Sequence, residues 1–349
     1  MAVAAEREPS VQPMWFERVS AGWWALIFVL LTAPVWANSF FLFQVMGWTF
    51  ILGMIALSLM FLAGYGGMVS LLQMSVAAMA GYMVAIFGTS GVTAISMGLP
   101  FWVSIPVAIV IAAIFATLVG ALAVRTEGIY TIMITLAIAA AFFYFTRQNY
   151  GIFNGYSGFN LVVPPRLFGI DWRQPVPFYY LSLGCAAICY AAVIYVSRSP
   201  FGLALQGVRD NPRRMAALGY NVTAHRIAAY TFASVIAAIG GILLVWQNAQ
   251  ISPGTAGIPA VIDILVIAVV GGLARPIGPF IGALIYVLLR TFSPDVLLTF
   301  GLSGERFKLL IGLGFLAVVF FSPDGVLGLW ERWKERRAKA RDPLAGSGG

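Results

Sequence analysis

Charged residues are scarce in this chain of 349 residues: they make up 10% of the sequence, whereas 60% of the residues are hydrophobic. Soluble domains carry roughly 25% charged residues, and residues 19–124 contain no Asp, Glu, Lys, Arg or His. A water-exposed surface cannot be built from such a stretch, which excludes a soluble enzyme and a nucleic-acid-binding protein. A disordered chain is excluded too, because it could not keep so much apolar surface in water. We therefore expect a polytopic protein embedded in the lipid bilayer.

Histidine, cysteine and lysine are also rare. A single histidine, His225, excludes a metal site built from histidines, and we expect it to be solvated beside Arg226. The two cysteines exclude a disulfide scaffold; Cys185 and Cys189 share one helix face, where packing is favoured over redox chemistry. No lysine follows the glycine-rich sequence of a phosphate-binding loop. We therefore predict no enzymatic activity and no cofactor bound by this chain.

Apolar runs separated by glycine, proline and charged residues predict an all-α fold of about ten transmembrane helices, since each span needs about 20 apolar residues. The weakest separations between spans fall near residues 64–67 and 271–276, where two spans could form one broken element. The predicted spans are 20–37, 41–63, 68–88, 101–124, 128–146, 177–197, 223–247, 259–273, 277–292 and 306–322.

The positive charges predict the orientation. With the N-terminus in the cytoplasm, most arginines and lysines fall on the cytoplasmic side, as the positive-inside rule requires. Both termini are then cytoplasmic: residues 1–19 form an N-terminal segment, 20–322 the transmembrane domain and 323–349 a C-terminal tail. Residues 147–176 form an outward loop and residues 198–226 a cytoplasmic one. The basic residues left on the outer side are Arg147, Arg166, Arg173, Arg290, Arg306 and Lys308.

The cytoplasmic loop contains the start and stop signals of a short helix. Asp210 and Asn211 are N-cap residue types, Pro212 suits the first helical position, and Gly219 suits the C-terminal cap. The predicted helix, residues 213–218, could lie on the membrane surface or dock in a groove of a cytosolic partner. Its small residues favour docking.

Four stretches together resemble one family, the LivM-type permeases of branched-chain amino acid ABC importers, over about residues 45–330. In the cytoplasmic loop, the family pattern Gly-x-Ala-Leu-x-x-x-Arg-Asp/Glu-Asn-x-x-x-Ala-x-x-x-Gly is met by Gly202, Ala204, Leu205, Arg209, Asp210, Asn211, Ala216 and Gly219. The other stretches are Gly64–Leu71 with Gly81-Tyr82, Arg125–Tyr130 with Thr135–Ala137, and Gly271–Pro279 with Gly282-Ala283.

The resemblance implies a function and partners. It implies a permease subunit in the bacterial inner membrane that translocates branched-chain or related amino acids. Its implied partners are a second, similar permease, two cytosolic ATP-binding subunits that use ATP-Mg, and an external solute-binding protein; no nucleic acid is implied. The helix that couples to the ATPases is implied at Arg209, Asp210, Asn211, Pro212, Ala216, Ala217 and Gly219.

The glycine clusters have two possible roles. Broken backbone at membrane depth is tolerated only where it is buried or faces a watery cavity, so the clusters could line the translocation path and touch the solute. Alternatively, small residues there allow tight turns and close helix packing. The candidate path residues are Gly64, Tyr65, Gly66, Gly67, Ser70, Gln73, Gly271 and Gly272.

Ionisable residues are almost absent from the predicted spans. Asp263 is the one candidate carboxylate, facing either a polar path or the membrane interface. Without a proton relay or a nucleotide site, a pump of this kind must take its energy from other subunits. The alternatives are a permease for urea or short-chain amides and a stand-alone channel for a small neutral solute. A membrane-embedded enzyme lacks the converging ionisable groups that it needs.

Overall fold

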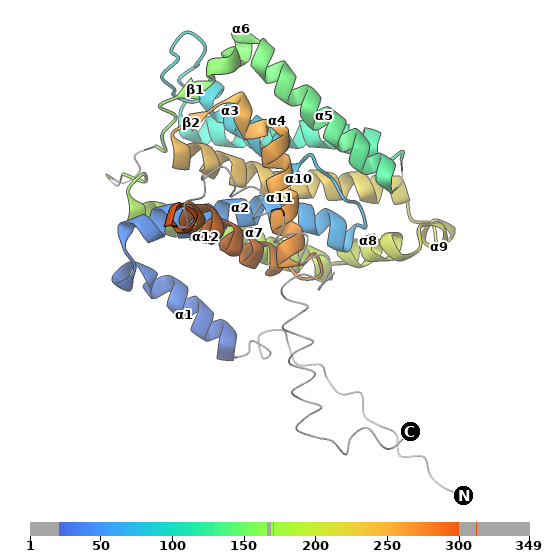
Figure 1. Ribbon diagram of the computed structural model, residues 1–349. Helices are drawn as coiled ribbons and strands as arrows, with labels where there is room; N and C mark the ends of the chain where they lie inside the picture. The colour runs from blue at the N-terminus through green and yellow to red at the C-terminus, as the bar shows by residue number, and fades with distance from the viewer. Residues whose placement is uncertain (1–20, 127, 166–168, 170, 300–311, 313–349) are drawn as a thin grey trace, which may run out of the picture.

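The computed structural model describes residues 21–126, 128–165, 169, 171–299 and 312. This part of the chain is mostly helical, as predicted, and its elements form one bundle with α1 set apart from it (Figure 1). The predicted span 306–322 and the terminal segments 1–19 and 323–349 lie outside the described residues, apart from residue 312.

Each of the predicted spans within the described residues overlaps a helix. Five of these helices are long and apolar enough to cross a membrane. The long helical elements are α1 (Ala21–Trp36), a continuous segment of η2 (Phe41–Gly47), α2 (Trp48–Met60) and η3 (Phe61–Tyr65), then α3 (Gln73–Phe87), α4 (Phe101–Ala123), α5 (Ile129–Gln148), α7 (Pro175–Arg198), α10 (Val222–Asn248), α11 (Ile258–Gly271) and α12 (Gly278–Thr299).

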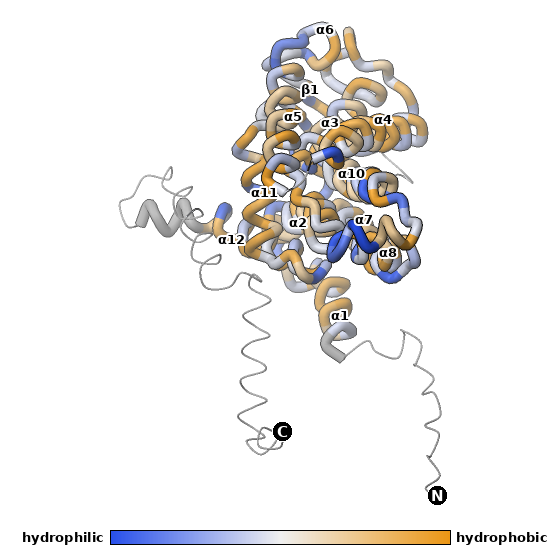
Figure 2. The backbone as a smooth tube through the Cα atoms, turned by 90° about the vertical axis from the view of Figure 1, so that its right-hand side faces the viewer, coloured by the Kyte–Doolittle hydropathy of each residue, from blue (hydrophilic) through white to orange (hydrophobic). Residues whose placement is uncertain are grey.

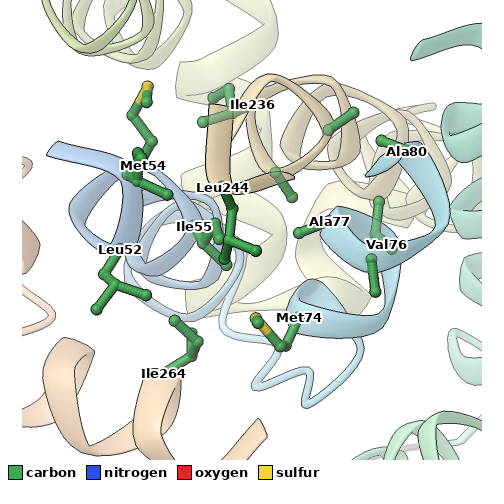
Figure 3. Close-up of a cluster of buried hydrophobic side chains, with 14 of the residues drawn as sticks. Leu52, Met54, Ile55, Met74, Val76, Ala77, Ala80, Ile236, Leu244 and Ile264 are labelled. Carbon is green, nitrogen blue, oxygen red and sulfur yellow. The ribbon is translucent and has the colours of Figure 1, made fainter. Parts of the chain in front are cut away.

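The α2 segment is the central helix of the bundle. In its most apolar stretch 89% of the residues are buried, compared with 28% in the corresponding stretches of α4, α5 and α7. Figure 3 shows the core around it, where Ile55 of α2, Leu244 of α10 and Ala77 of α3 point toward one another. Gly241 lets α10 approach α3 closely, because a Cβ atom there would overlap the Ala77 backbone.

The outer helices carry apolar residues on their exposed faces. Trp102, Val110 and Leu118 of α4 are each more than half exposed, and such a surface is stable only against lipid or another apolar partner. Figure 2, which views the molecule from the α8–α9 end, shows hydrophobic colour along α4 and hydrophilic segments around α8. The apolar belt and the polar end agree with a bundle that spans a membrane.

Helix α1 leaves the bundle but is held to it near Pro34. Pro34 lacks the N–H group that would donate to the Leu30 carbonyl. The Tyr179 hydroxyl donates to that carbonyl at 2.6 Å, and the Tyr180 hydroxyl donates to the Leu31 carbonyl at 3.0 Å. Tyr179 therefore replaces the donor that the proline lacks, and Tyr180 adds a second bond between α7 and α1.

A small strand pair departs from the all-α prediction. In the predicted outward loop 147–176, α6 (Tyr150–Phe153) and η4 (Gly155–Ser157) lead into β1 (Phe159–Asn160), which pairs antiparallel with β2 (Gln250–Ile251). The next element is η5 (Pro253–Ala256). Each strand buries one residue, Phe159 or Ile251, and the two-stranded ribbon pairs the backbone groups of these half-buried segments.

Candidate functional site

The central helix ends in a break at the predicted glycine cluster. The last turn of the segment, η3, is a π-helix, a form that is frequent at functional sites. Helical structure then stops: Gly67 has a φ of 66°, which side-chain-bearing residues rarely adopt, and the Met68 N–H turns back to the Leu62 carbonyl at 3.0 Å. The predicted span 68–88 therefore begins later than expected, at Gln73, where α3 starts.

Residues 66–72 form a non-helical turn, which we call the buried turn. Ser70, Leu71 and Leu72 are each less than 7% exposed. Because buried backbone polar groups need partners, the Leu71 N–H donates to Thr135 Oγ1 of α5 at 3.2 Å, and the Leu72 N–H donates to Ser70 Oγ at 3.3 Å. The irregular backbone of this turn is thus enclosed by protein, the condition under which such backbone is tolerated within a bilayer.

Arg209 joins the loop 198–226 to this break. Its Nη1 donates to the Gly64 carbonyl at 2.5 Å, and its Nε donates to the Asp210 carboxylate at 2.8 Å. A Cβ atom at Gly67 would lie 2.5 Å from Arg209 Cγ, so the aliphatic stem of the arginine rests on the bare backbone of this glycine. The side chain of Arg209 is 40% exposed. One arginine therefore binds both the last turn of the central helix and the first residues of the buried turn.

The second glycine cluster packs against the first. The Gly64 backbone contacts the Leu273 carbonyl, in the turn between α11 and α12. Within that turn the backbones of Gly271 and Gly278 touch, so no side chain fits between them. The two clusters, far apart in the sequence, thus meet at one end of the bundle.

The loop 198–226 contains two helices where the sequence predicted one. The missed helix is α8 (Pro200–Asp210); Ser199 caps it by accepting from the Gly202 N–H at 3.3 Å, and Pro200 is its first residue. Proline at the first position is a helix start signal, which the prediction of a single helix at residues 213–218 did not use. Gly202 is buried against the end of α7, which is why a glycine is tolerated inside α8.

The short predicted helix is present as α9 (Pro212–Ala217). Asn211 caps it by accepting from the Arg214 N–H at 3.0 Å, and Gly219 follows it with a φ of 91°. Asp210 was expected to cap this helix, but it is instead the last residue of α8. We call residues 200–219 the α8–α9 segment; it projects from the right-hand end of the bundle (Figure 1).

The predicted coupling residues separate into two groups. Ala216, Ala217 and Gly219 are exposed to solvent on α9 or just after it. Arg209, Asp210 and Asn211 instead bind within the chain and hold the segment in place. Pro212 begins α9. One group is free to meet a partner, and the other connects that surface to the bundle.

The predicted path residues lie around the buried turn but are mostly enclosed. Gly66, Ser70 and Gln73 are buried, whereas Gly67 is exposed. Gln73 is only 1% exposed, and its side-chain oxygen accepts from Ser58 Oγ of α2 at 3.0 Å. These contacts illustrate the close-packing role of the cluster; contact with a solute stays a prediction.

The other candidate residues from the sequence, namely the histidine, the two cysteines and the intramembrane carboxylate, lie outside this site. His225 stacks on Phe201 with ring centroids 5.6 Å apart, which joins α10 to α8. Both cysteines are unpaired thiols, and Cys189 is buried. Asp263 of α11 lies beside the Tyr286 hydroxyl of α12, so it faces a neighbouring helix.

Sequence reasoning missed the partners that complete the site. Arg209 and Gly64 are 145 positions apart, and Thr135 and Leu71 are 64 apart. Thr135 lies in one of the stretches that carry the family resemblance, which was the one available signal. Leu273 offered none, because its contribution is a backbone carbonyl.

Residues 41–319 match the family model described as branched-chain amino acid transport system / permease component. The chain belongs to this permease family. The match confirms the resemblance to LivM-type permeases and leaves α1 outside the matched range. The permease is thus a multi-pass membrane protein of a transport family.

Characterised relatives carry the same description. The high-affinity branched-chain amino acid transport system permease protein LivM of Escherichia coli is 22% identical over 253 residues, or 66% of this chain and 58% of that protein. The LivM protein of Salmonella typhimurium gives the same values. The corresponding BraD protein of Pseudomonas aeruginosa is 30% identical over 144 residues, or 40% of this chain and 44% of that protein. The chain thus spans less than two thirds of these relatives' length, and no solved structure matches it.

Proposed function

We propose that the chain is the membrane-embedded permease subunit of an ABC-type importer for branched-chain or related amino acids in the bacterial cytoplasmic membrane. The names of its relatives support this substrate class. About ten spans with both termini in the cytoplasm form part of the proposal, in agreement with the polar α8–α9 end of the bundle (Figure 2).

The proposed partners are a second permease, two cytosolic ATP-binding subunits and an external solute-binding protein. ATP-Mg is then bound by the cytosolic subunits alone. The surface proposed for the ATPases is α9, where Ala216 and Ala217 are exposed and small enough to allow a close approach.

The observation that carries the proposal is the hydrogen bond from Arg209 to the Gly64 carbonyl. It connects the exposed α8–α9 segment to the end of the most buried helix. A displacement of α9 by the ATPases therefore reaches the central helix through one side chain. A bundle with two discrete packings would respond by opening to one side of the membrane or to the other.

The docking assignment is tested in the complex of this permease with its ATPases and partner permease. We expect Ala216→Glu to release the ATPases during copurification, because an acidic side chain fills the surface that they need. The matched control is Ala94→Glu, which changes an exposed alanine of the 88–99 loop at the opposite end of the bundle. Equal ATPase retention in both variants contradicts docking on α9.

The energy source is tested in liposomes. The importer proposal predicts no flux of leucine or urea through this chain alone, and ATP-dependent leucine uptake by the whole complex. Flux of urea through the purified chain without ATP would establish the passive channel instead.

A further inference from the structure

A cavity of about 230 Å³ lies at the opposite end of the central helix from the buried turn. It opens between η2 and the start of α2, the end of α10, and α12. Trp48 on its wall and Gly64 at the Arg209 contact are separated by about 24 Å at the α-helical rise of 1.5 Å per residue. The polar and aromatic residues on its wall include Gln44, Trp48, Gln247, Asn248, Arg290 and Thr291.

The cavity has a positive pole at Arg290. The guanidinium lies 5.2 Å from the centre of the Trp48 ring, which holds it by a cation–π contact. Such a contact uses the face of the guanidinium and leaves its N–H edge available for a carboxylate. None of the described residues on the cavity wall is acidic, and Asp263, which lies beside Tyr286, is not on that wall.

The opposite wall offers hydrogen-bond acceptors. Gln247 is only 5% exposed, and its Nε2 donates to the Phe43 carbonyl at 2.6 Å. Its Oε1 is enclosed against Gly47 and does not face the cavity, whereas Asn248, also on the wall, is exposed and its amide oxygen can accept a hydrogen bond. Helix α10 ends at Asn248, and the C-terminal end of a helix carries partial negative charge that favours a cation.

We infer that this cavity binds a small zwitterion, with the carboxylate on Arg290 and the ammonium group toward Asn248 and the end of α10. Its volume is below that of pockets for drug-sized ligands, so a single amino acid fits this description better than a peptide. The π-helical wall at Phe43 and Gln44 is of the type that recurs at functional sites. The inference rests on the proposed function for the identity of the solute and for the outward position of the cavity.

The test measures how a ligand protects the cavity from a thiol reagent. Thr291→Cys is placed in a Cys185→Ala, Cys189→Ala chain, assembled with its partner subunits in nanodiscs, and labelled with a negatively charged thiosulfonate. If the inference holds, L-leucine lowers the labelling rate by the factor 1 + [L]/Kd, about fivefold at four times Kd. Leucinamide, which lacks the carboxylate, gives no protection at the same concentration. Gln44→Cys repeats the measurement on the other wall if Thr291→Cys does not assemble.

The arginine variants identify the group responsible. Arg290→Gln raises the Kd of leucine, measured from this protection, by about tenfold or more, because a charge-assisted pair is lost. The matched control is Arg147→Gln, since Arg147 also lies over an aromatic ring, that of Tyr156 at 5.5 Å, but away from the cavity. Equal protection in the Arg290 variant, or protection by leucinamide, overturns the inference.

Two further arms separate the outcomes. Slower labelling with phosphatidylglycerol in the nanodisc, and no effect of leucine, would assign the cavity to a lipid headgroup and overturn the inference. ATP-driven leucine uptake is measured in the same complexes. Uptake without protection refutes the cavity alone, whereas protection without ATP-driven uptake refutes the proposed importer and leaves the zwitterion site standing.

Discussion

Replacing Arg209 with alanine should uncouple ATP hydrolysis from transport. The variant removes the hydrogen bond to the Gly64 carbonyl and the stem that covers Gly67. Hydrogen bonds from charged donors contribute roughly 1.5–3 kcal/mol to stability. The Arg209 side chain is 40% exposed, so water screens its charge and its hydrogen bond falls at the lower end of this range. About 1.5 kcal/mol corresponds to roughly tenfold in an equilibrium constant.

The assay is the number of solute molecules imported per ATP hydrolysed by the reconstituted complex. We expect this ratio to fall by about tenfold in Arg209→Ala, while the ATPases stay bound because α9 keeps its Asn211 cap. Arg209→Lys keeps the charge but not the forked donor group, and should give an intermediate ratio. Arg198→Ala, which changes an exposed arginine in the last turn of α7, is the matched control and should transport normally.

A normal ratio in Arg209→Ala would refute this reasoning. So would an equal loss in Arg198→Ala, since the effect would then come from positive charge near the membrane rather than from the bond to Gly64.

Three further predictions concern the same region. Gly67→Ala should lower the free energy of unfolding by about 1–2 kcal/mol, because its φ of 66° is strained for a side-chain-bearing residue and its Cβ meets Arg209; an unchanged thermal midpoint in detergent would contradict this. Thr135→Val removes the acceptor of the buried Leu71 N–H, at a cost of about 1–3 kcal/mol, and hydrogen exchange at Leu71 should accelerate; unchanged exchange would show that this bond is dispensable. Asn211→Ala removes the cap of α9, worth about 1 kcal/mol, and should weaken ATPase binding several-fold; equal affinity would argue against an ordered α9.

Much of the fold follows from the sequence because a bilayer imposes a simple rule on helix length and polarity. The predicted limits of α4, 101–124, differ from the observed Phe101–Ala123 by one residue. The rule fails where the chain leaves regular structure but stays buried. Residues 68–72 are apolar enough to be counted with the following span, yet they form part of the buried turn because Gly66 and Gly67 end the helix.

The α8–α9 segment shows the opposite error. Pro200 and Gly202 were interpreted as loop residues, whereas Ser199 and Pro200 begin a helix and Gly202 packs its backbone on α7. A glycine inside a helix is costly in isolation, so only the tertiary contact explains why the helix continues through it.

Several residues of the candidate site were predictable, but the contacts that join them were not. The glycines and Arg209 stood out in the sequence, yet their contact joins residues 145 positions apart. Gln73 was expected among the path residues of the first glycine cluster; its observed bond to Ser58 gives it a structural role. Periodicity predicts local elements, whereas such pairings depend on how the helices pack.

The central claim is that the α8–α9 segment acts on the buried turn through the contact that Arg209 makes with Gly64 and Gly67. The most direct test replaces this contact with a disulfide that can be formed and reduced. The Arg209 Cβ lies 3.4 Å from a Cβ built on Gly67, close to the separation of about 3.5–4.5 Å in a disulfide. A Gly67→Cys, Arg209→Cys variant, with Cys185 and Cys189 changed to alanine, should import little solute per ATP when reduced. Oxidation should restore the ratio, because a covalent bond then replaces the arginine. Normal import in the reduced form, or no recovery after complete oxidation, would contradict the claim.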